Sequence, residues 1–358
     1  PLGKYWMDHP GRRTYRTVVF DPRKPQEFAP NPDKPNELIY NLWEGLSIEP
    51  KKGSWKKMRK HIWEIVCNKN KVKFKYVMRW FAWTKQNIHD RAEVAMVLKG
   101  KQGSGKGILL SQFEKVFGQH YMCIASADHL TGKFNAHLRR TVFLFADEAY
   151  DPKDRESEGK LKQLITEPSI PIEAKFKDTV LAKNRLHIVM ATNNARVIVA
   201  GEDSRRFFIN EVDNKWAKGQ GKSDDERTAY FTPIWREMDT GGREAMIFDF
   251  MNTKLGDWHP RSNVPETEEM KNQRRLQFNE TNAVLEWFEL GEFPGKFDGY
   301  HYVVKSSTLE KHMREKIPSL KDPRMISWKK ILDVLNKLGV NKTNQRIRRT
   351  STGIFISM

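Results

Sequence analysis

The sequence predicts an α/β fold with a mostly parallel sheet in the middle of the chain, and smaller helical and mixed segments on either side. Two observations predict this fold. Between residues 88 and 215, short apolar runs typical of strands alternate with stretches of helical spacing, which favours parallel strands joined by helices. A glycine-rich turn ending in a lysine lies directly between the first apolar run and the helical stretch after it. The length of 358 residues is typical of two or three domains.

Residues 1–40 are predicted to be a linker or extended arm and not part of a core. They open with Pro1-Leu2-Gly3, which is typical of the remnant of a cleaved expression tag, so we expect a fragment of a longer protein. The segment is rich in lysine, arginine and proline, which favours an extended chain. Its prolines are Pro22, Pro25, Pro30, Pro32 and Pro35.

Residues 41–87 are predicted to form a basic helical domain, because the apolar spacing is helical in stretches such as MRKHIWEIVCNKN. Within it, residues 51–85 hold twelve lysines and arginines against one acidic residue, Glu64. Aromatic residues among basic ones can stack nucleic-acid bases, but at helical spacing they more often form a core, which is what we expect here. These aromatic residues are Trp63, Trp80, Phe81 and Trp83.

Residues 88–215 are predicted to form the α/β domain itself. Its strand-like runs are VAMVL, YMCIAS, TVFLFA, LHIVMA and RRFFINEV. Residues 216–290 are predicted to be a helical and irregular connecting region with a long helix over 264–290.

Residues 291–358 are predicted to form a small module of two helices and a basic hairpin. The helices are expected in SSTLEKHMREKI and SWKKILDVLNKLGV, and the hairpin in NQRIRRTSTGIFIS with its turn at Thr350–Gly353. Two helices followed by a basic hairpin resemble a winged helix, in which Arg346, Arg348 and Arg349 would contact DNA. The alternative is a small α+β appendage used for assembly.

The charge predicts a polyanionic partner, for which nucleic acid is the first candidate. The formal net charge is +18 and the isoelectric point about 9.7. A surface that serves solubility is the alternative, but the clustering of charge in residues 51–85 and 321–358 argues against it. The two cysteines, Cys67 and Cys123, exclude a disulfide framework and a CxxC metal pair, and they favour a reducing compartment. No apolar run approaches the roughly 18 residues of a membrane helix, and no secretory signal opens the chain.

The glycine-rich turn, GKQGSGK at Gly100–Lys106, matches the phosphate-binding pattern GxxxxGK. Glycines let backbone N–H groups converge on phosphate oxygens, and the following helix adds positive potential. In this pattern a Ser or Thr hydroxyl after the lysine ligates magnesium, but here the next residue is Gly107. The residues predicted to bind the nucleotide are Gly100, Gly103, Ser104, Gly105, Lys106 and Gly107.

An acidic pair follows the third apolar run, 41 residues beyond Lys106. A buried strand ending in Asp147 and Glu148 would present both carboxylates beside the phosphate loop. Asp147 would then hold magnesium, directly or through water, and Glu148 would polarise the attacking water. The alternative is an ordinary strand end capped by acids.

Two further polar groups follow in order. Asn193 comes directly after the fourth apolar run, where an amide can touch the terminal phosphate or orient the water, although a plain turn explains it equally well in isolation. Arg205 and Arg206 precede the fifth run. An arginine offered to the nucleotide of a neighbouring subunit stabilises charge in the transition state, and a surface arginine pair is the alternative.

The order of phosphate loop, acidic pair, amide and arginines within residues 100–206 resembles the superfamily 3 helicases, a branch of the AAA+ ATPases. Several other strings look like the helicase portion of phage primase-polymerase proteins. They are YNLWEGLSIEP, DHLTGKFNAHL, FADEAY, GKLKQLITEPSIPIEAKFKD, ATNNARVI and DSRRF. The resemblance spans about residues 40–212 and is weak beyond them.

This resemblance implies an AAA+ core that binds ATP and Mg²⁺, with Lys106 on the phosphates, Asp147 and Glu148 as the residues that serve magnesium and water, and Asn193 as sensor. It implies that Arg206 or Arg205 acts on a neighbour's nucleotide, and that Lys175 and Lys177 reach into a central channel. Because magnesium keeps several waters in its shell, Gly107 is expected to lower affinity or rate without changing the reaction.

We therefore expect an ATP-dependent DNA helicase of phage replication, acting on single-stranded and fork DNA as a hexameric ring. Residues 41–87 would form a collar or guide DNA. An upstream primase-polymerase domain of the same polypeptide is expected to have been removed, and the protein is expected in the cytoplasm of the infected host cell, without a membrane partner. The alternatives are an inactive ATP-binding module for DNA binding and assembly, and an AAA+ switch or packaging motor that does not unwind DNA.

Overall fold

The computed structural model describes residues 2–30, 34, 36–150, 155–194, 197, 204–276, 284, 287–288, 290–297, 301–317, 320, 327–337, 340–346 and 352–357. The chain divides into two compact units, residues 1–273 and 274–358. The sequence placed the last boundary near residue 290 instead, at the end of an expected helix. Each unit has its own hydrophobic core.

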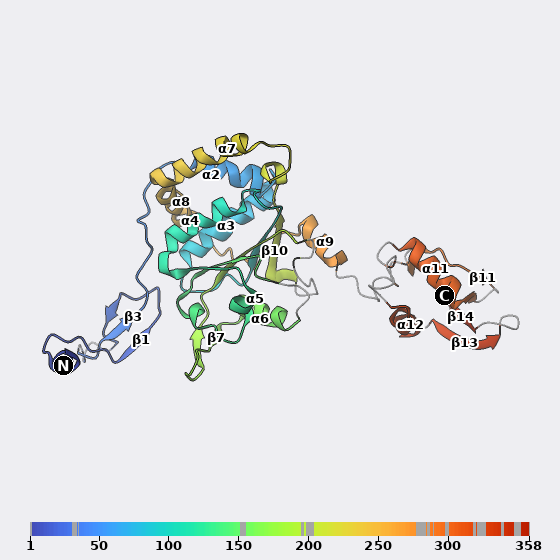
Figure 1. Ribbon diagram of the computed structural model, residues 1–358, viewed down its shortest axis with the longest axis horizontal. Helices are drawn as coiled ribbons and strands as arrows, with labels where there is room; N and C mark the ends of the chain where they lie inside the picture. Colours follow the sequence, from blue (N-terminus) through green and yellow to red (C-terminus); the bar gives the residue numbers. More distant parts are fainter. Residues whose placement is uncertain are drawn as a thin grey trace. The chain divides into compact units, whose positions relative to one another are not determined.

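The first unit is built on a five-stranded sheet in the order β10-β4-β9-β6-β5, and every pair is parallel. Its central strands are buried on both faces, which is why their sequences are almost continuously apolar. Each predicted apolar run contributes one strand, so the mixed α/β fold with a parallel sheet is confirmed (Figure 1). The strands are β4 (Ala95–Lys99), β5 (Tyr121–Ile124), β6 (Phe143–Asp147), β9 (His187–Thr192) and β10 (Phe207–Glu211).

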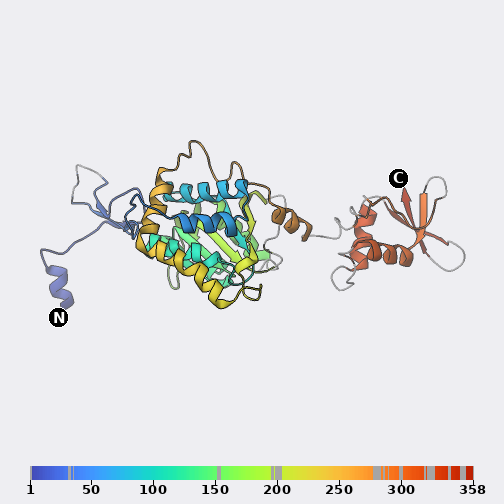
Figure 2. The ribbon, with the colours of Figure 1, turned by 90° about the horizontal axis from the view of Figure 1, so that it is seen from above.

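Helices cover both faces of this sheet. Met96 and Leu98 of β4 belong to one core cluster, and Ala95 and Val97 to the other, because alternate side chains of a strand face opposite ways. The first cluster packs under α3 (Lys71–Gln86), α4 (Lys106–Phe117) and α8 (Arg243–Asn252), and the second under α5 (Ala127–Thr131) and α6 (Arg155–Thr166) (Figures 1 and 2).

The basic segment 41–87 shares the first of these cores with the sheet. It forms α2 (Lys56–His61), which continues as a π-helical turn, η1 (Ile62–Val66), and α3. The break before α3 is fixed by Asn70, whose side chain accepts hydrogen bonds from the N–H groups of Val72 and Lys73. Trp80 and Phe81 are fully buried, so these aromatic residues form a core, as expected.

The N-terminal segment is more ordered than its composition predicted. It forms α1 (Leu2–Asp8) and a small sheet of β1 (Thr17–Val19), β2 (Glu27–Phe28) and β3 (Ile39–Asn41) in the order β1-β3-β2. The buried side chain of Asn41 donates to the carbonyls of Asp21 (2.9 Å) and Lys24 (2.8 Å), and Phe20 packs on Trp43. The segment therefore has local structure, organised by one buried amide, but among its described residues up to 40 only Phe20 is buried.

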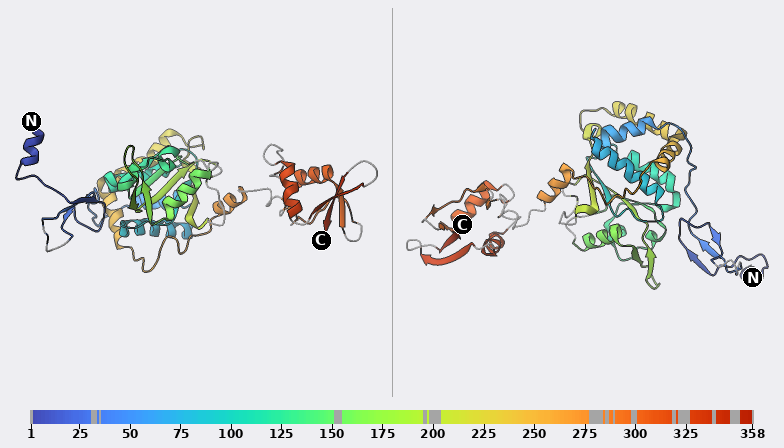
Figure 3. Two further views of the ribbon diagram at one scale, coloured as in Figure 1. Left: turned by 90° about the horizontal axis from the view of Figure 1, so that it is seen from below. Right: turned by 180° about the vertical axis from the view of Figure 1, so that it is seen from behind.

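Residues 213–276 add helices to the first unit, and the last of them crosses the boundary at residue 273. They form η5 (Asn214–Trp216), α7 (Asp224–Glu237), a π-helical turn η6 (Met238–Gly242), α8, and α9 (Glu268–Leu276). The long helix expected from residue 264 begins only at Glu268, because the Thr267 hydroxyl accepts from the N–H of Met270 and caps it. The remaining elements are η2 (Gly118–His120), η3 (Ala136–Arg140), η4 (Ser204–Arg206) and a hairpin of β7 (Ser169–Ile172) and β8 (Val180–Lys183), which extends from the body (Figures 1 and 3).

The second unit contains both predicted helices and the predicted hairpin. Its antiparallel sheet has the order β11-β12-β14-β13. The turn expected at Thr350–Gly353 is wrong in part, since Thr352 and Gly353 pair with Arg346 and Thr343 and thus belong to a strand. The elements are β11 (Lys296–Phe297), β12 (His301–Lys305), α11 (Ser306–Lys316), α12 (Trp328–Lys337), β13 (Asn341–Arg346) and β14 (Thr352–Ser357).

Among the described residues of both units, no helix has the length and apolar character needed to span a membrane.

Candidate functional site

The loop between β4 and α4 lies at the carboxyl edge of the parallel sheet. The N–H of Gly100 donates to the carbonyl of Thr192 at the end of β9, 3.0 Å away, which ties the start of the loop to the neighbouring strand. Gly105 directly precedes α4 and has a φ of 103°, a conformation that favours glycine. A Cβ at Gly105 would lie 2.6 Å from Cε1 of His61, so the close packing beneath the loop also requires glycine.

His61 supports this loop from below. Its Nε2 lies 3.1 Å from the carbonyl oxygen of Gly105, and its Nδ1 lies 3.1 Å from the hydroxyl of Tyr230. Burial lowers the pKa of His61 to about 4, against a weaker opposing effect of the Gly105 hydrogen bond. The ring is therefore neutral at pH 7, with Nε2–H donating to the loop and Nδ1 accepting from Tyr230. We call His61 the buttress of the loop. No sequence motif marks its contact with Gly105, so the sequence did not predict it.

Lys106 occupies the centre of the loop. Its ammonium group donates to the carbonyls of Gly100 and Lys101, the latter at 3.0 Å. Burial lowers the pKa of Lys106, and the nearby carboxylates of Asp147 and Glu148 oppose this shift. The lysine is thus a partly desolvated cation held in place by the loop, which suits a polyphosphate ligand.

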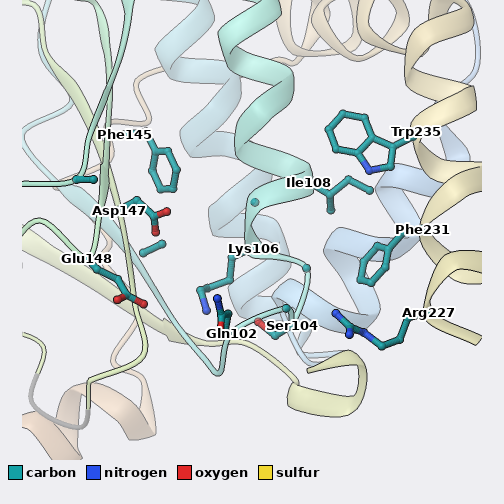
Figure 4. A pocket seen from close by; sticks show the side chains of 15 residues that line it. Gln102, Ser104, Lys106, Ile108, Phe145, Asp147, Glu148, Arg227, Phe231 and Trp235 are labelled. Carbon is teal, nitrogen blue, oxygen red and sulfur yellow. The ribbon is translucent and has the colours of Figure 1, made fainter. Parts of the chain in front are cut away.

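The predicted acidic pair faces this lysine. Asp147 is the last residue of β6, and Glu148 follows with a φ of 54°, a value uncommon for residues other than glycine and often found at functional sites. The N–H of Glu148 donates to the carbonyl of Ala191 in β9, 2.9 Å away. One cavity of about 680 Å³ is lined by residues 102–108, Asp147 and Glu148, so the loop and the acids come together as expected (Figure 4).

Gly107 is exposed at the first turn of α4, and a Cβ built on it would meet no atom within 4 Å. A serine or threonine would therefore fit. Across the described ranges, no group of three or more His, Cys, Asp and Glu side chains is placed to hold a metal ion. Asp147 and Glu148 are hard oxygen donors that fit Mg²⁺ carried by a nucleotide, whose phosphates and water would complete its shell.

The other predicted catalytic residues lie outside this cavity. Asn193 follows β9 at the same edge of the sheet, is exposed, and does not line the cavity. Arg205 and Arg206 lie in η4 and precede β10, whose first residue, Phe207, pairs with Ala95 at the start of β4. The arginines thus lie at the amino edge of the sheet, opposite the loop.

A third group of cavity residues was missed by the sequence analysis. Arg227, Phe231 and Trp235 of α7 line the same cavity as Lys106 (Figure 4). They recur every four residues, so they occupy one face of the helix. That spacing is the signal in the sequence, but nothing in it indicates that α7 packs beside the loop.

The predicted DNA contacts fall in two places. Lys175 and Lys177 flank Phe176 in the connection between β7 and β8, and all three side chains are exposed. The ammonium group of Lys175 lies 5.6 Å from the centre of the Phe134 ring. Arg346 is the last residue of β13, whereas Arg348 and Arg349 lie outside the described residues.

Parts of this chain are similar in sequence to a protein family and to a curated phage protein. Residues 98–206 match a protein family described as a family of unknown function (DUF5906). A curated relative, the DNA primase-polymerase of Nitratiruptor phage NrS-1, is 28% identical over 141 residues. The match corresponds to 38% of this chain and 19% of that protein, so the chain spans about a fifth of the relative's length.

Solved structures of the NrS-1 C-terminal region share the fold. The apo structure of that region has a TM-score of 0.65 at 18% identity, and the match covers 95% of this chain and 84% of that chain. Its A form gives the same values. The resemblance to the C-terminal portion of a phage primase-polymerase, suggested by the sequence, is confirmed.

Proposed function

We propose that this chain is the ATP-hydrolysing motor of a DNA helicase of the superfamily 3 type, with an AAA+ core. The observation that carries this proposal is the single cavity in which the phosphate loop with Lys106 meets Asp147 and Glu148. A replication protein among its relatives, the phage primase-polymerase, supports a role in phage DNA replication.

In this proposal each group in the cavity has one task. The loop N–H groups and Lys106 bind the phosphates, and Asp147 holds the Mg²⁺ that accompanies ATP. Glu148 polarises the water that attacks the terminal phosphate, and Asn193, which lies outside the cavity at the end of β9, would contact that phosphate only by turning its side chain toward it. Phosphoryl transfer depends mainly on positioning and electrostatics, which the tethered loop and the partly desolvated lysine supply.

DNA would be gripped by the β7–β8 hairpin. Lys175 and Lys177 are solvated cations on either side of an exposed phenylalanine. Cations that pair with phosphates and an aromatic ring that stacks on bases are the usual means of binding single strands without sequence preference. The second unit, as a winged-helix module with Arg346, would add contacts to duplex or fork DNA.

The arginine pair supports assembly into a ring. Arg206 precedes the residue that pairs with Ala95, whereas the phosphate loop follows Lys99. At about 3.3 Å per residue, Phe207, the residue after Arg206, lies roughly 13 Å along the strand from the level of Lys99, so Arg206 lies farther still from its own loop. An arginine at that position is better placed to contact the nucleotide of a neighbouring subunit than the nucleotide of its own subunit, as in a hexameric ring.

The ring proposal is tested by mixing subunits. We expect Arg206→Ala to abolish turnover with nearly unchanged affinity for ATP, and small fractions of the variant to poison wild-type assemblies. A loss of activity in linear proportion to the variant fraction contradicts action between subunits.

A second candidate function is favoured by Gly107, which leaves magnesium one protein ligand short of the usual pattern. In this candidate the chain binds ATP only in order to assemble on DNA. Unwinding of a forked duplex with ATP supports the helicase. ATP turnover without strand separation supports an AAA+ switch or packaging motor, and binding without turnover supports the assembly module.

A further inference from the structure

One face of α7 forms a wall of the cavity that no part of the proposed chemistry uses. The face consists of Arg227, Phe231 and Trp235, which are spaced at four-residue intervals and all line the cavity. α7 starts from a capping box formed by Ser223 and Glu226, so its first turn is well defined.

The wall is fixed to the helix that supports the phosphate loop. The carboxylate of Glu237, near the end of α7, accepts from the N–H groups of Lys57 (3.1 Å) and Met58 (3.0 Å) at the start of α2. Tyr230 contacts His61 at the end of the same helix. The distance from this wall to the loop is therefore held by two contacts, one at each end of α2.

The rings of the wall differ in how much surface they offer. Phe231 is packed edge-on by His61 and Trp216, with ring centroids 6.0 and 6.3 Å away. Trp235 is 38% exposed and makes no ring contact within the described part of the chain. A large exposed indole that lines a cavity is a ready surface for a planar ligand.

The order of groups along the wall matches the order of groups in a nucleotide. Arg227 lies at the loop, since a Cβ on Gly103 would be 2.6 Å from its Nη2. Phe231 and Trp235 follow at increasing distance from Arg227 along the helix. Figure 4 shows the acidic pair on one side of Lys106, and Ile108, Phe231 and Trp235 on the other. Phosphates bound at Lys106 therefore direct the base toward the aromatic rings.

We propose that α7 forms the nucleobase wall of this site, and that Phe231 and Trp235 recognise the faces of a purine and not its edges. The one side-chain amide among the residues that line the cavity, Gln102, lies beside Lys106 in the phosphate loop and away from Phe231 and Trp235 (Figure 4), and the two rings carry no group that accepts a hydrogen bond from the polar edge of a base. The site consequently accepts adenine and guanine nucleotides with similar affinity and favours both over cytosine, whose smaller ring stacks less. This inference rests on the proposed nucleotide site.

The test measures the binding of ATP, GTP, CTP and inorganic tripolyphosphate by calorimetry, with Mg²⁺, to the full chain. We expect Trp235→Ala to weaken ATP and GTP binding roughly tenfold, as for loss of one stacked base, and to leave tripolyphosphate within about twofold. Trp235→Phe keeps most of the affinity. Trp6→Ala, which removes an exposed indole from α1, is the matched control and has no effect.

Two outcomes overturn the inference while keeping the nucleotide site. In one, Trp235→Ala and Phe231→Ala change ATP and tripolyphosphate binding equally or not at all. In the other, the wild-type chain prefers ATP over GTP by about a hundredfold or more, which requires edge recognition. If Lys106→Ala binds ATP and tripolyphosphate as well as the wild type does, the proposed nucleotide site itself is wrong, and the inference falls with it.

Discussion

The chain presents its lysines to anions in two contrasting ways. At the phosphate loop, Lys106 is partly buried, its pKa is lowered by burial, and its ammonium group is held by two loop carbonyls. At the tip of the β7–β8 hairpin, Lys175 and Lys177 are exposed, and Phe176 between them is fully exposed with a φ of 59°.

The difference in setting indicates a difference in task. A desolvated cation in a fixed position interacts strongly with one ligand geometry, because little solvent screens it. Solvated cations on a projecting turn interact weakly with each phosphate and tolerate any sequence, and their contribution falls with added salt. The two regions thus suit the nucleotide and the DNA strand, respectively.

The largest expected effect comes from Lys106→Ala. Removing the central cation should reduce ATP turnover at least a hundredfold, the usual effect of losing one group that stabilises developing charge. Lys101→Ala is the matched control, because Lys101 lies in the same loop with an exposed side chain and contacts Lys106 through its backbone only. Equal ATP turnover in Lys106→Ala and Lys101→Ala would contradict the claim that the partly buried Lys106 acts on the nucleotide and an exposed lysine does not.

The next effect is expected at the hairpin. Lys175→Ala combined with Lys177→Ala should weaken single-stranded DNA binding about tenfold and leave ATP binding intact. The slope of log affinity against log salt should become shallower by about 1.4, since each lost phosphate contact removes about 0.7. Lys183→Ala, at the base of the hairpin, serves as the control. If the salt slope is unchanged in the double variant, Lys175 and Lys177 do not contact DNA.

A smaller effect is expected from the buttress under the loop. The pKa of His61 is lowered to about 4 in the folded chain, from about 6.5 in the unfolded chain, so between these values the unfolded state binds more protons. The free energy of unfolding should therefore fall as the pH drops from about 6.5 to 4.

The variant His61→Gln retains an N–H donor for the Gly105 carbonyl but does not titrate. Urea unfolding at pH 7 and pH 5.5 should show a loss of stability about 1 kcal/mol smaller in this variant than in the wild type. His9→Gln, on the N-terminal arm, should match the wild type. Burial also lowers the pKa of His187, to about 3, so part of the loss of stability at low pH remains in every variant.

The smallest effect is expected from restoring the missing hydroxyl. A serine at Gly107 has room for its side chain and would add a magnesium ligand in place of a water. We expect Gly107→Ser to raise ATP turnover about two- to threefold at limiting Mg²⁺. Gly107→Ala controls for the gain in helix propensity, and identical behaviour of the two variants would show that the hydroxyl binds no metal.

The sequence predicted the parts of the fold that local patterns determine. The five strands are apolar runs bounded by polar residues. Lys106 begins the helix that follows β4, and Asp147 is the last residue of β6. Their meeting at one edge follows from parallel pairing, which the alternation of strands and helices predicts. The second unit's helices were visible for the same reason.

The parts that the sequence did not predict depend on packing between distant segments. His61 contacts Gly105 across 44 positions of the chain, and Trp235 lies more than 100 residues beyond the loop whose cavity it lines. The burial of Trp80 and Phe81, by contrast, was predicted, because their helical spacing favours a core position. Composition concealed the buried Asn41 that organises the N-terminal arm.

The central claim is that one chain couples a proposed nucleotide site in the cavity to a proposed DNA-binding site on the β7–β8 hairpin. It is tested most directly by measuring steady-state ATP turnover of the wild type, with and without single-stranded DNA, beside Lys106→Ala and the Lys175/Lys177 double variant. We predict that DNA stimulates the wild type several-fold, that the double variant keeps its basal rate without stimulation, and that Lys106→Ala shows neither. Turnover by the wild type that does not exceed the Lys106→Ala background, with or without DNA, would contradict the account.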